Sequence, residues 1–231
     1  MISRNYFIIG GSSSIGESLI KKLKNLNKVS YTYNKNKIKE FAGSQNITSI
    51  KLNLNSKKDI SNLKKYKKKI DVLILCAAQT KFINEKNFKQ LTPKLFEKII
   101  NGNLSTSYEI VYNLLGKLNK DSHLIFVSSI AAKNSIGSNV AYSCSKAGLN
   151  ILTKFFSRVL GKHTIVNAIA PGLMKTNFTK NFDKNYFNNY RRKSATKVLT
   201  RPEQVADLII NISSKKMNLN GQVIYLDGGI Y

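Results

Sequence analysis

The chain has 231 residues, and 42% of them are apolar, so it is long enough to bury a sizeable core without disulfides or metals. Its formal net charge of +26 raises nucleic acids, anionic membranes and acidic carrier molecules as partners. The lysines are nevertheless spread over nearly the whole sequence, and only residues 57–69 and 191–193 are clustered. A solvated basic surface accounts for this pattern, and we expect no nucleic-acid partner.

No targeting or membrane-spanning segment is expected. Arg4 and a short apolar stretch follow the first residue almost at once, which is unlike a secretory leader. No apolar run is long enough to cross a bilayer. We therefore expect a cytoplasmic protein with no membrane partner.

The cysteines and histidines give no metal-site pattern. Cys76 and Cys144 lie far apart and lack metal-ligand spacing, so we expect both to be small core residues. His123 and His163 are solitary, and we expect them at the surface or at a strand edge. No metal is predicted.

Predicted strands and helices alternate along the chain. An apolar strand at Tyr6–Ile9 is followed by a Gly/Ser turn and then by a helix with apolar residues at helical spacing from Ile15 to Leu23. Six further strands are predicted at residues 29–33, 47–52, 72–75, 124–127, 165–169 and 223–226, and helices at 93–118, at 142–160 and after Leu199. Apolar strands separated by helices require a parallel sheet covered on both faces, which is a doubly wound α/β fold. We expect one domain over residues 1–231.

Two helix ends carry local signals. Thr200, Pro202 and Glu203 form the pattern of a capping box at the start of the last helix. Gly161 stands where a residue of left-handed conformation would close the helix at 142–160.

The Gly/Ser turn after the first strand has two interpretations. A surface turn needs only flexible residues, and glycine and serine are common in such turns. A dinucleotide-binding turn needs a strand, a glycine turn and a helix in this order, with Gly10 reversing the chain and Gly16 allowing the helix to start close to the strand. The glycine spacing alone does not decide between them.

The predicted fifth strand ends at Ser129, and Tyr142 and Lys146 follow on a predicted helix. Residues four apart share a helix face, so the ammonium of Lys146 is expected near the phenol of Tyr142. A close cation lowers a phenol pKa, which would let Tyr142 exchange protons with an alcohol or carbonyl near neutral pH. Each residue alone has an ordinary structural explanation, whereas the joint spacing favours a catalytic site.

These motifs resemble the short-chain dehydrogenase/reductase family over essentially the whole chain. The segments that carry the resemblance are IGGSSSIG, VLILCAAQT, NGNLS, SSIAAKNSIGSNVAYSCSK, VNAIAPGLMKT and NGQVIYLDGG. The resemblance implies a Rossmann-type, three-layer αβα sandwich with a seven-stranded parallel sheet. It is greatest to the 3-oxoacyl-acyl-carrier-protein reductase branch.

The resemblance also assigns catalytic roles. Tyr142 would be the general acid/base, and Ser129 would hydrogen-bond the substrate carbonyl. Lys146 would hold the nicotinamide ribose and lower the Tyr142 pKa, while Asn103 would position a water that links Lys146 to solvent. The implied cofactor-binding residues are Gly10, Ser12, Ser13, Ser14, Ile15, Gly16, Asn34, Lys35, Asn53, Leu54, Ala77, Ala78, Tyr142, Lys146, Pro171, Gly172, Leu173 and Thr176.

The sequence departs from the family pattern at two places in the cofactor site. Ser14 replaces the middle glycine of the turn, and a positive φ there would cost on the order of 1 kcal/mol. The NNAG motif is replaced by residues 75–78, LCAA.

The second strand is followed by Tyr33–Lys37, which contains no carboxylate to bind a ribose diol. A 2′-phosphate would instead meet Lys35, with Ser13 or Asn34 beside it, so NADP(H) is preferred over NAD(H). Asn53 replaces the acid expected beside the adenine.

Residues 173–199 occupy the position of the family's substrate lid and combine aromatic with basic side chains. These are Phe178, Phe182, Tyr186, Phe187 and Tyr190 beside Lys180, Lys184, Arg191 and Arg192. They fit an apolar cleft with a basic rim for an acidic substrate or an acyl chain on an acidic carrier. They fit a packed amphipathic helix equally well.

The helix at 142–160 carries more apolar surface than one sheet needs. Leu149, Leu152, Phe156 and Leu160 form one row, and Ile151, Phe155 and Val159 widen it. We therefore expect a homodimer or homotetramer.

The leading hypothesis is an NADP(H)-dependent ketoreductase that acts on a small-molecule or carrier-bound carbonyl. One alternative is a reductase or dehydrogenase for a sugar or another polar metabolite. An alternative of another class is an NADP(H)-binding sensor or scaffold without catalysis.

Overall fold

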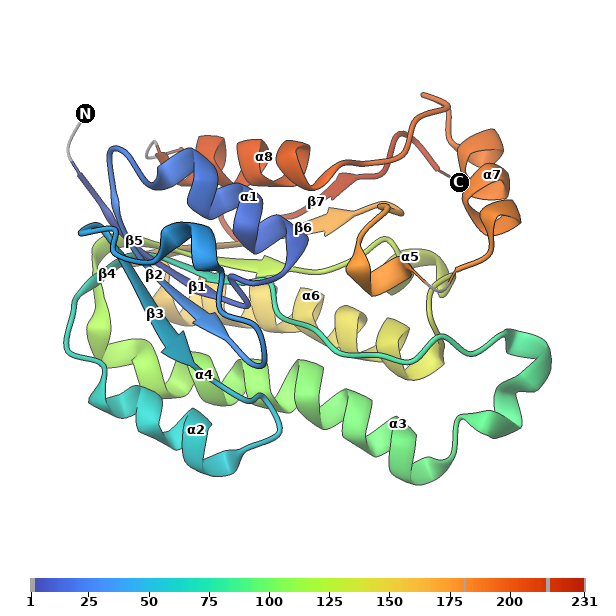
Figure 1. Cartoon of the computed structure of the whole chain (residues 1–231), viewed down its shortest axis with the longest axis horizontal. Coiled ribbons are helices and arrows are strands. Elements are labelled where there is room, and N and C mark those ends of the chain that lie inside the picture. Colours follow the sequence, from blue (N-terminus) through green and yellow to red (C-terminus); the bar gives the residue numbers. More distant parts are fainter. Residues whose placement is uncertain (1–2, 181, 215–216, 231) are drawn as a thin grey trace.

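A computed structural model describes residues 3–180, 182–214 and 217–230. Seven parallel strands form one sheet in the order β3-β2-β1-β4-β5-β6-β7 (Figure 1). The strands are β1 Asn5–Ile9, β2 Lys28–Tyr33, β3 Ile47–Lys51, β4 Ile70–Leu75, β5 Leu118–Val127, β6 Thr164–Pro171 and β7 Val223–Leu226. The predicted doubly wound α/β fold is confirmed.

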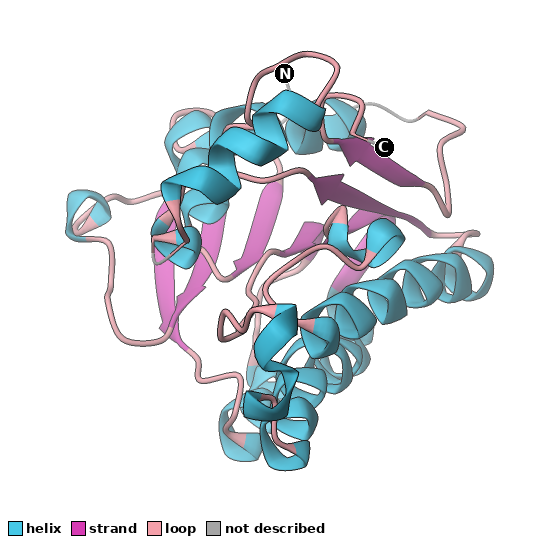
Figure 2. Ribbon diagram, turned by 90° about the vertical axis from the view of Figure 1, so that its right-hand side faces the viewer, coloured by secondary structure: helices cyan, strands magenta, loops and turns pink. Residues whose placement is uncertain are grey.

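Helices cover both faces of this sheet (Figure 2). The helices of the described residues are α1 Ser14–Leu23, α2 Lys57–Asn62, α3 Pro93–Ile100, α4 Thr106–Leu114, α5 Ala131–Asn134, α6 Val140–Leu160, α7 Lys184–Lys193 and α8 Pro202–Ser214, of which α7 lies beyond the end of the sheet (Figure 1). Short 3-10 turns are η1 Lys39–Phe41, η2 Leu63–Lys65, η3 Glu85–Gln90, η5 Leu115–Lys117 and η6 Asn177–Thr179, and η4 Asn101–Ser105 is a π-helical turn. Within the described ranges, no helix has the length and apolarity that a bilayer crossing requires.

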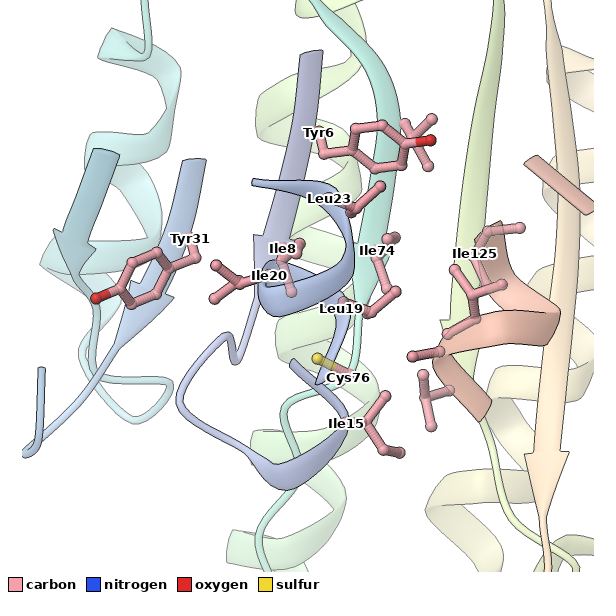
Figure 3. Packing of buried hydrophobic residues seen from close by; sticks show 14 of the residues in the cluster. Tyr6, Ile8, Ile15, Leu19, Ile20, Leu23, Tyr31, Ile74, Cys76 and Ile125 are labelled. Carbon is pink, nitrogen blue, oxygen red and sulfur yellow. The ribbon is translucent and has the colours of Figure 1, made fainter. Parts of the chain in front are cut away.

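Two cores lie on the two sheet faces. Alternate residues of β1 point to opposite faces, so Ile8 packs beneath α1 and α8, whereas Phe7 packs toward α2, α4 and α6. Figure 3 shows the first core, where Leu19 and Ile20 of α1 lie over Ile8 and Ile74. Burial on both faces explains why the central strands read as continuous apolar runs.

The predicted helix at 93–118 runs to Lys117 but is not α-helical throughout. The α-helical hydrogen bonding of α3 gives way to the π-helical turn η4 before α4 begins, and Leu118 already belongs to β5. Gly102 lies within this turn, where an added Cβ would clash with the side chain of Gln79. Apolar periodicity cannot reveal such a turn, because the π turn inserts one residue without ending the helix.

α8 begins at Pro202 and α6 ends at Leu160, close to where the signals predicted, but the predicted capping geometry is wrong in both cases. Arg201, not Thr200, directly precedes α8, since its carbonyl oxygen accepts from the Gln204 and Val205 N–H groups, and the Thr200 hydroxyl donates to the Leu226 carbonyl oxygen (2.8 Å). Instead the Arg201 N–H donates to the Gln204 side chain (2.9 Å), one residue later than predicted. Gly161 ends α6 with φ −57°, in the right-handed region, so it is not a left-handed cap.

Of the cysteines and histidines, Cys144 and His123 have environments that differ from the predictions. Cys76 is buried, as expected, but Cys144 is exposed. His163 is exposed, whereas His123 is 3% exposed in the middle of the sheet, where burial lowers its pKa to about 4. His123 pairs with Val72 and Ile165 on the neighbouring strands. Its burial could not be predicted from the sequence, because a solitary polar side chain is expected at the surface.

Candidate active site

The turn after β1 brings backbone from three segments into close contact. Gly10 has φ +88°, and a Cβ there would lie 2.6 Å from the backbone nitrogen of Ala77. Ser13 caps α1 by accepting a hydrogen bond from the Gly16 N–H (3.1 Å). A Cβ on Gly16 would lie 2.5 Å from the Gly10 carbonyl oxygen, so the helix start requires glycine. Such a helix N-terminus beside a glycine turn suits a diphosphate.

Ser14 is the first residue of α1 and does not have a positive φ. The backbone cost considered for this position is therefore absent. The Gly16 N–H donates to Ser13, and the preceding N–H groups of Ser14 and Ile15 have no partners within the helix, so they can face an anion. The replacement of glycine by serine is thus compatible with a cofactor turn.

Cys76, in the segment that replaces NNAG, ties β4 to this turn. Its sulfur lies 3.2 Å from the Ile9 carbonyl oxygen and 3.3 Å from that of Gly10, and it accepts from the Ser13 hydroxyl at 3.6 Å. Burial raises the pKa of the thiol to about 11, so it keeps its proton and can donate. The thiol thus supplies a buried polar contact at the turn.

One cavity of about 400 Å³ lies beyond the carboxyl ends of β1, β4, β5 and β6. The strand order reverses at β1, and ligands of doubly wound sheets bind at such a switch point. Nine residues of the implied cofactor set line this cavity besides Tyr142 and Lys146, namely Ser12, Ser13, Ser14, Ile15, Ala78, Pro171, Gly172, Leu173 and Thr176. Gly10, Gly16 and Ala77 form the close-packed backbone behind the turn.

The remaining four residues of the implied cofactor set lie on two other segments, outside this cavity. Asn34 and Lys35 are exposed after β2, and Asn53 and Leu54 follow β3. The Asn53 side-chain oxygen accepts from the Asn55 N–H (3.0 Å). Both segments lie at the carboxyl ends of strands on the β2 side of the switch point, where the adenosine half of a dinucleotide would extend.

Ser129, Tyr142 and Lys146 line the same cavity. The Lys146 Nζ lies 5.6 Å from the centre of the Tyr142 ring, so the i, i+4 spacing does place the two side chains on one face of α6. Lys146 is 2% exposed, and its ammonium donates to the Val127 carbonyl oxygen at the end of β5 (2.6 Å). The arrangement presents a hydroxyl, a phenol and an ammonium to one space.

The expected lowering of the Tyr142 pKa is not what the structure gives. Burial raises the pKa of Tyr142 to about 12, and a hydrogen bond with Ser129 only partly offsets this rise. Burial also lowers the pKa of Lys146 to about 8. Desolvation is the largest effect on the pKa of both groups, and the ammonium donates to the Val127 carbonyl oxygen. At neutral pH the phenol therefore holds a proton that it can donate.

Asn103 lies in the π-helical turn η4 and does not line the cavity. Its side-chain oxygen accepts from the Gln79 N–H (2.8 Å), and its amide nitrogen donates to the Gln79 carbonyl oxygen (2.9 Å) and to Ser145 (3.1 Å). These bonds join the segment after β4 to η4 and α6. They include no contact with Lys146, so the water-positioning role stays a prediction.

Asn139 was missed by the sequence reasoning. It caps α6 by accepting from the Tyr142 N–H (2.9 Å), and its amide donates to Thr80 (3.0 Å) and to the Lys81 carbonyl oxygen (2.7 Å). Its position three residues before the tyrosine, at the start of the apolar helix pattern, was the available signal.

The outer wall of the cavity comes partly from residues 173–199. Phe178 lies 5.7 Å from Tyr142 between ring centres, and Phe82 packs at 4.5 Å against Phe182. Phe182, Tyr186 and Tyr190 also line the cavity, together with Ile136 and Met174, which the sequence did not single out. Phe187 is 8% exposed and packed. The aromatic residues thus contribute both to the cavity wall and to packing, whereas Lys180, Lys184, Arg191 and Arg192 do not line this cavity. The substrate-lid role stays a prediction.

Comparisons with known proteins agree with this geometry. A family model described as enoyl-(acyl carrier protein) reductase matches residues 10–231. The 3-oxoacyl-(acyl-carrier-protein) reductase FabG of Buchnera aphidicola is 29% identical over 238 residues, which cover 97% of this chain and 96% of that protein. FabG of Rickettsia felis is 26% identical over 238 residues, covering 100% and 98%. The Pseudomonas aeruginosa RhlG/NADP active-site complex has a TM-score of 0.87 at 22% identity, covering 99% and 96%.

The chain therefore belongs to the short-chain dehydrogenase/reductase family of NAD(P)-dependent oxidoreductases. Its named sequence relatives are ketoreductases, so it falls in the ketoreductase-like branch that the motifs predicted.

Proposed function

We propose that this protein reduces a ketone to an alcohol with NADPH, using Ser129, Tyr142, Lys146 and Asn103. The observation that carries the proposal is the convergence of the first three side chains on one cavity beside the glycine turn. Residues 173–199 would form its substrate lid within a single domain of residues 1–231. A cytoplasmic location without nucleic-acid partners remains our prediction from the sequence.

The cavity residues divide the chemistry between them. The bound cofactor would supply a hydride to the carbonyl carbon. Tyr142, which holds its proton because its pKa is raised to about 12, would donate that proton to the carbonyl oxygen. The Ser129 hydroxyl would orient this oxygen, and the Lys146 ammonium would stabilise the phenolate that remains.

The preference for NADP(H) rests on the end of β2. Asn34 and Lys35 are exposed there, no carboxylate lies between Tyr33 and Lys37, and a 2′-phosphate would meet a cation. RhlG of Pseudomonas aeruginosa, which shares this fold, forms a complex with NADP, and this supports the same choice. Direct titration with NADPH and NADH would test it, and equal affinities would contradict it.

The substrate we propose is a 3-oxoacyl thioester. The aromatic and aliphatic outer wall of the cavity suits an acyl chain better than a sugar. Two full-length sequence relatives are named as reductases of 3-oxoacyl groups on acyl carrier protein.

A substrate panel tests this proposal. Purified protein with NADPH is offered 3-oxoacyl thioesters, diketones and keto-sugars, and NADPH consumption is followed by absorbance. We expect the highest kcat/KM with thioesters. If keto-sugars are reduced and no thioester is turned over, the proposal is contradicted, and the alternative of a reductase for a polar metabolite is supported.

A further inference from the structure

A second cavity, of about 390 Å³, adjoins the first and is lined by residues of the proposed lid itself. The two cavities share Thr176, Thr179 and Phe182 as wall residues. The shared wall includes η6, and α7 forms the far side of the second cavity. The two cavities are therefore adjacent.

The second cavity is lined by four cations from two segments. Lys175 and Lys180 flank η6, while Lys184 and Arg191 belong to α7. Lys184, Phe187, Asn188 and Arg191 have the spacing i, i+3, i+4 and i+7, which places them on one face of α7.

These positive charges are not neutralised by the protein. In the part of the chain that the structure describes, none of the four cations forms an ion pair. The nearest acid in sequence is Asp183, whose carboxylate accepts from the Asn185 N–H (2.9 Å) as the cap of α7. Among the described residues, no acidic side chain lines the cavity.

Aromatic side chains complete the site. Phe187 is buried, Phe182 is half-buried, and Lys175 Nζ lies 5.7 Å from the centre of the Phe187 ring. The four cations are themselves exposed, and the apolar wall beside them reduces the screening of their charges by water on that side, which strengthens the attraction for an anion. Arg191 adds a planar donor group that matches phosphate oxygens.

We propose that this cavity binds a phosphate group of the substrate, while the substrate carbonyl lies at Tyr142. This inference rests on the proposed function and narrows its substrate class to phosphate-bearing 3-oxo compounds. The phosphate could belong to a small metabolite or to the arm of a carrier protein, and both present the same chemistry to Lys184 and Arg191.

Kinetics with matched substrates test the proposal. Acetoacetyl-4′-phosphopantetheine and acetoacetyl-pantetheine share the reacting group and differ by one phosphate. The double variant Lys184→Gln/Arg191→Gln should raise KM for the first by about tenfold, because charge-assisted hydrogen bonds are lost. The double variant should keep kcat for both substrates, and KM for acetoacetyl-pantetheine, within about twofold of the parent values, since exposed charges without a bound partner contribute little to stability.

Lys193→Gln is the matched control, because Lys193 is exposed on α7 but does not line the cavity. It removes a positive charge of the same helix and should change neither substrate's KM. Equal effects of the double variant on both substrates, or no effect on either, would overturn the proposal.

Two further arms separate the phosphate sources and the proposed function. If the double variant also raises KM for the carrier-bound substrate, the site binds the phosphate of the carrier arm. If it raises KM for the free phosphorylated compound alone, the site binds the phosphate of a small metabolite. Phosphorus NMR of inorganic phosphate with NADPH-saturated protein needs no turnover. If the phosphate signal is broadened by the parent and by Lys193→Gln but not by the double variant, the site is supported even if neither substrate is reduced. If the double variant still broadens the signal, the site is contradicted.

Discussion

Lys146 is 2% exposed, and burial lowers the pKa of its ammonium from 10.5 to about 8. Below pH 8 Lys146 is charged in both the folded and the unfolded state, but only folding removes its ammonium from water. This desolvation opposes folding. As pH rises from 8 to 10.5 the folded state releases this proton first, and stability relative to a chain without the lysine increases. Lys146→Met should thus be more stable than the parent at neutral pH, by roughly 1 to 3 kcal/mol.

Urea unfolding of both proteins at about pH 7 and about pH 9.5 measures this difference. The advantage of Lys146→Met should shrink at the higher pH. An advantage that grows with pH would show that the Lys146 ammonium stabilises the fold.

Gly10 offers a separate test of the turn. Gly10→Ala must place a side chain at φ +88° and within 2.6 Å of the Ala77 backbone. We therefore expect the free energy of unfolding to fall by roughly 3 kcal/mol or more and NADPH binding to weaken. Gly43→Ala is the control, because Gly43 has φ +82° and nothing within 4 Å of an added Cβ. It should cost only about 1 kcal/mol. Equal losses of unfolding free energy for the two variants would mean that the contact with Ala77 is unimportant.

The sequence predicted the position of a residue where a local motif determines it. It did not predict a pKa or a degree of burial that depends on residues far away in the sequence. The spacing of Tyr142 and Lys146 placed both on one helix face, and the structure brings them to one cavity. The Tyr142 pKa was predicted with the wrong sign, because burial and the Val127 carbonyl are properties of the folded chain. The burial of His123 was hidden for the same reason.

At the level of elements, the start of α6 positions the catalytic tyrosine. Asn139→Ala removes the cap and both ties to residues 80 and 81, and should cost about 1 to 2 kcal/mol. Because Tyr142 lies in the first turn, kcat should also fall about tenfold or more. Thr92→Ala, which removes the cap of α3, should lower stability by about 1 kcal/mol without lowering kcat. A kcat that is the same in both variants would leave Asn139 a purely structural cap.

The strands were predicted well because central parallel strands are apolar on both faces. The start of β5 was placed six residues too late, since Leu118–Ser122 mixes polar residues with a positive φ at Asp121 and gives no apolar run. The π-helical turn η4 and the shifted cap of α8 depend on contacts with Gln79 and Leu226, which local patterns do not contain.

At the scale of the whole molecule, one face of α6 is left uncovered. Ile151 is 65%, Phe155 42% and Val159 61% exposed, and Tyr108 and Tyr112 of α4 are exposed as well. We propose that this face forms a homodimer interface, and a tetramer would require a second interface. Ile151→Lys/Val159→Lys should therefore sediment as a monomer, whereas Leu26→Lys, at another exposed apolar residue, should sediment like the parent. A parent protein that is itself monomeric would contradict the proposal.

Turnover and cofactor binding of Tyr142→Phe test the central claim most directly, because this change removes one hydroxyl from the cavity and leaves the ring beside Lys146 and Phe178. If Tyr142 donates the proton, 3-oxoacyl reduction should fall by roughly 10² to 10⁴ while the Kd for NADPH stays within about twofold. A variant that reduces the substrate as fast as the parent would contradict the assignment of Tyr142 as the acid, and with it the proposed mechanism.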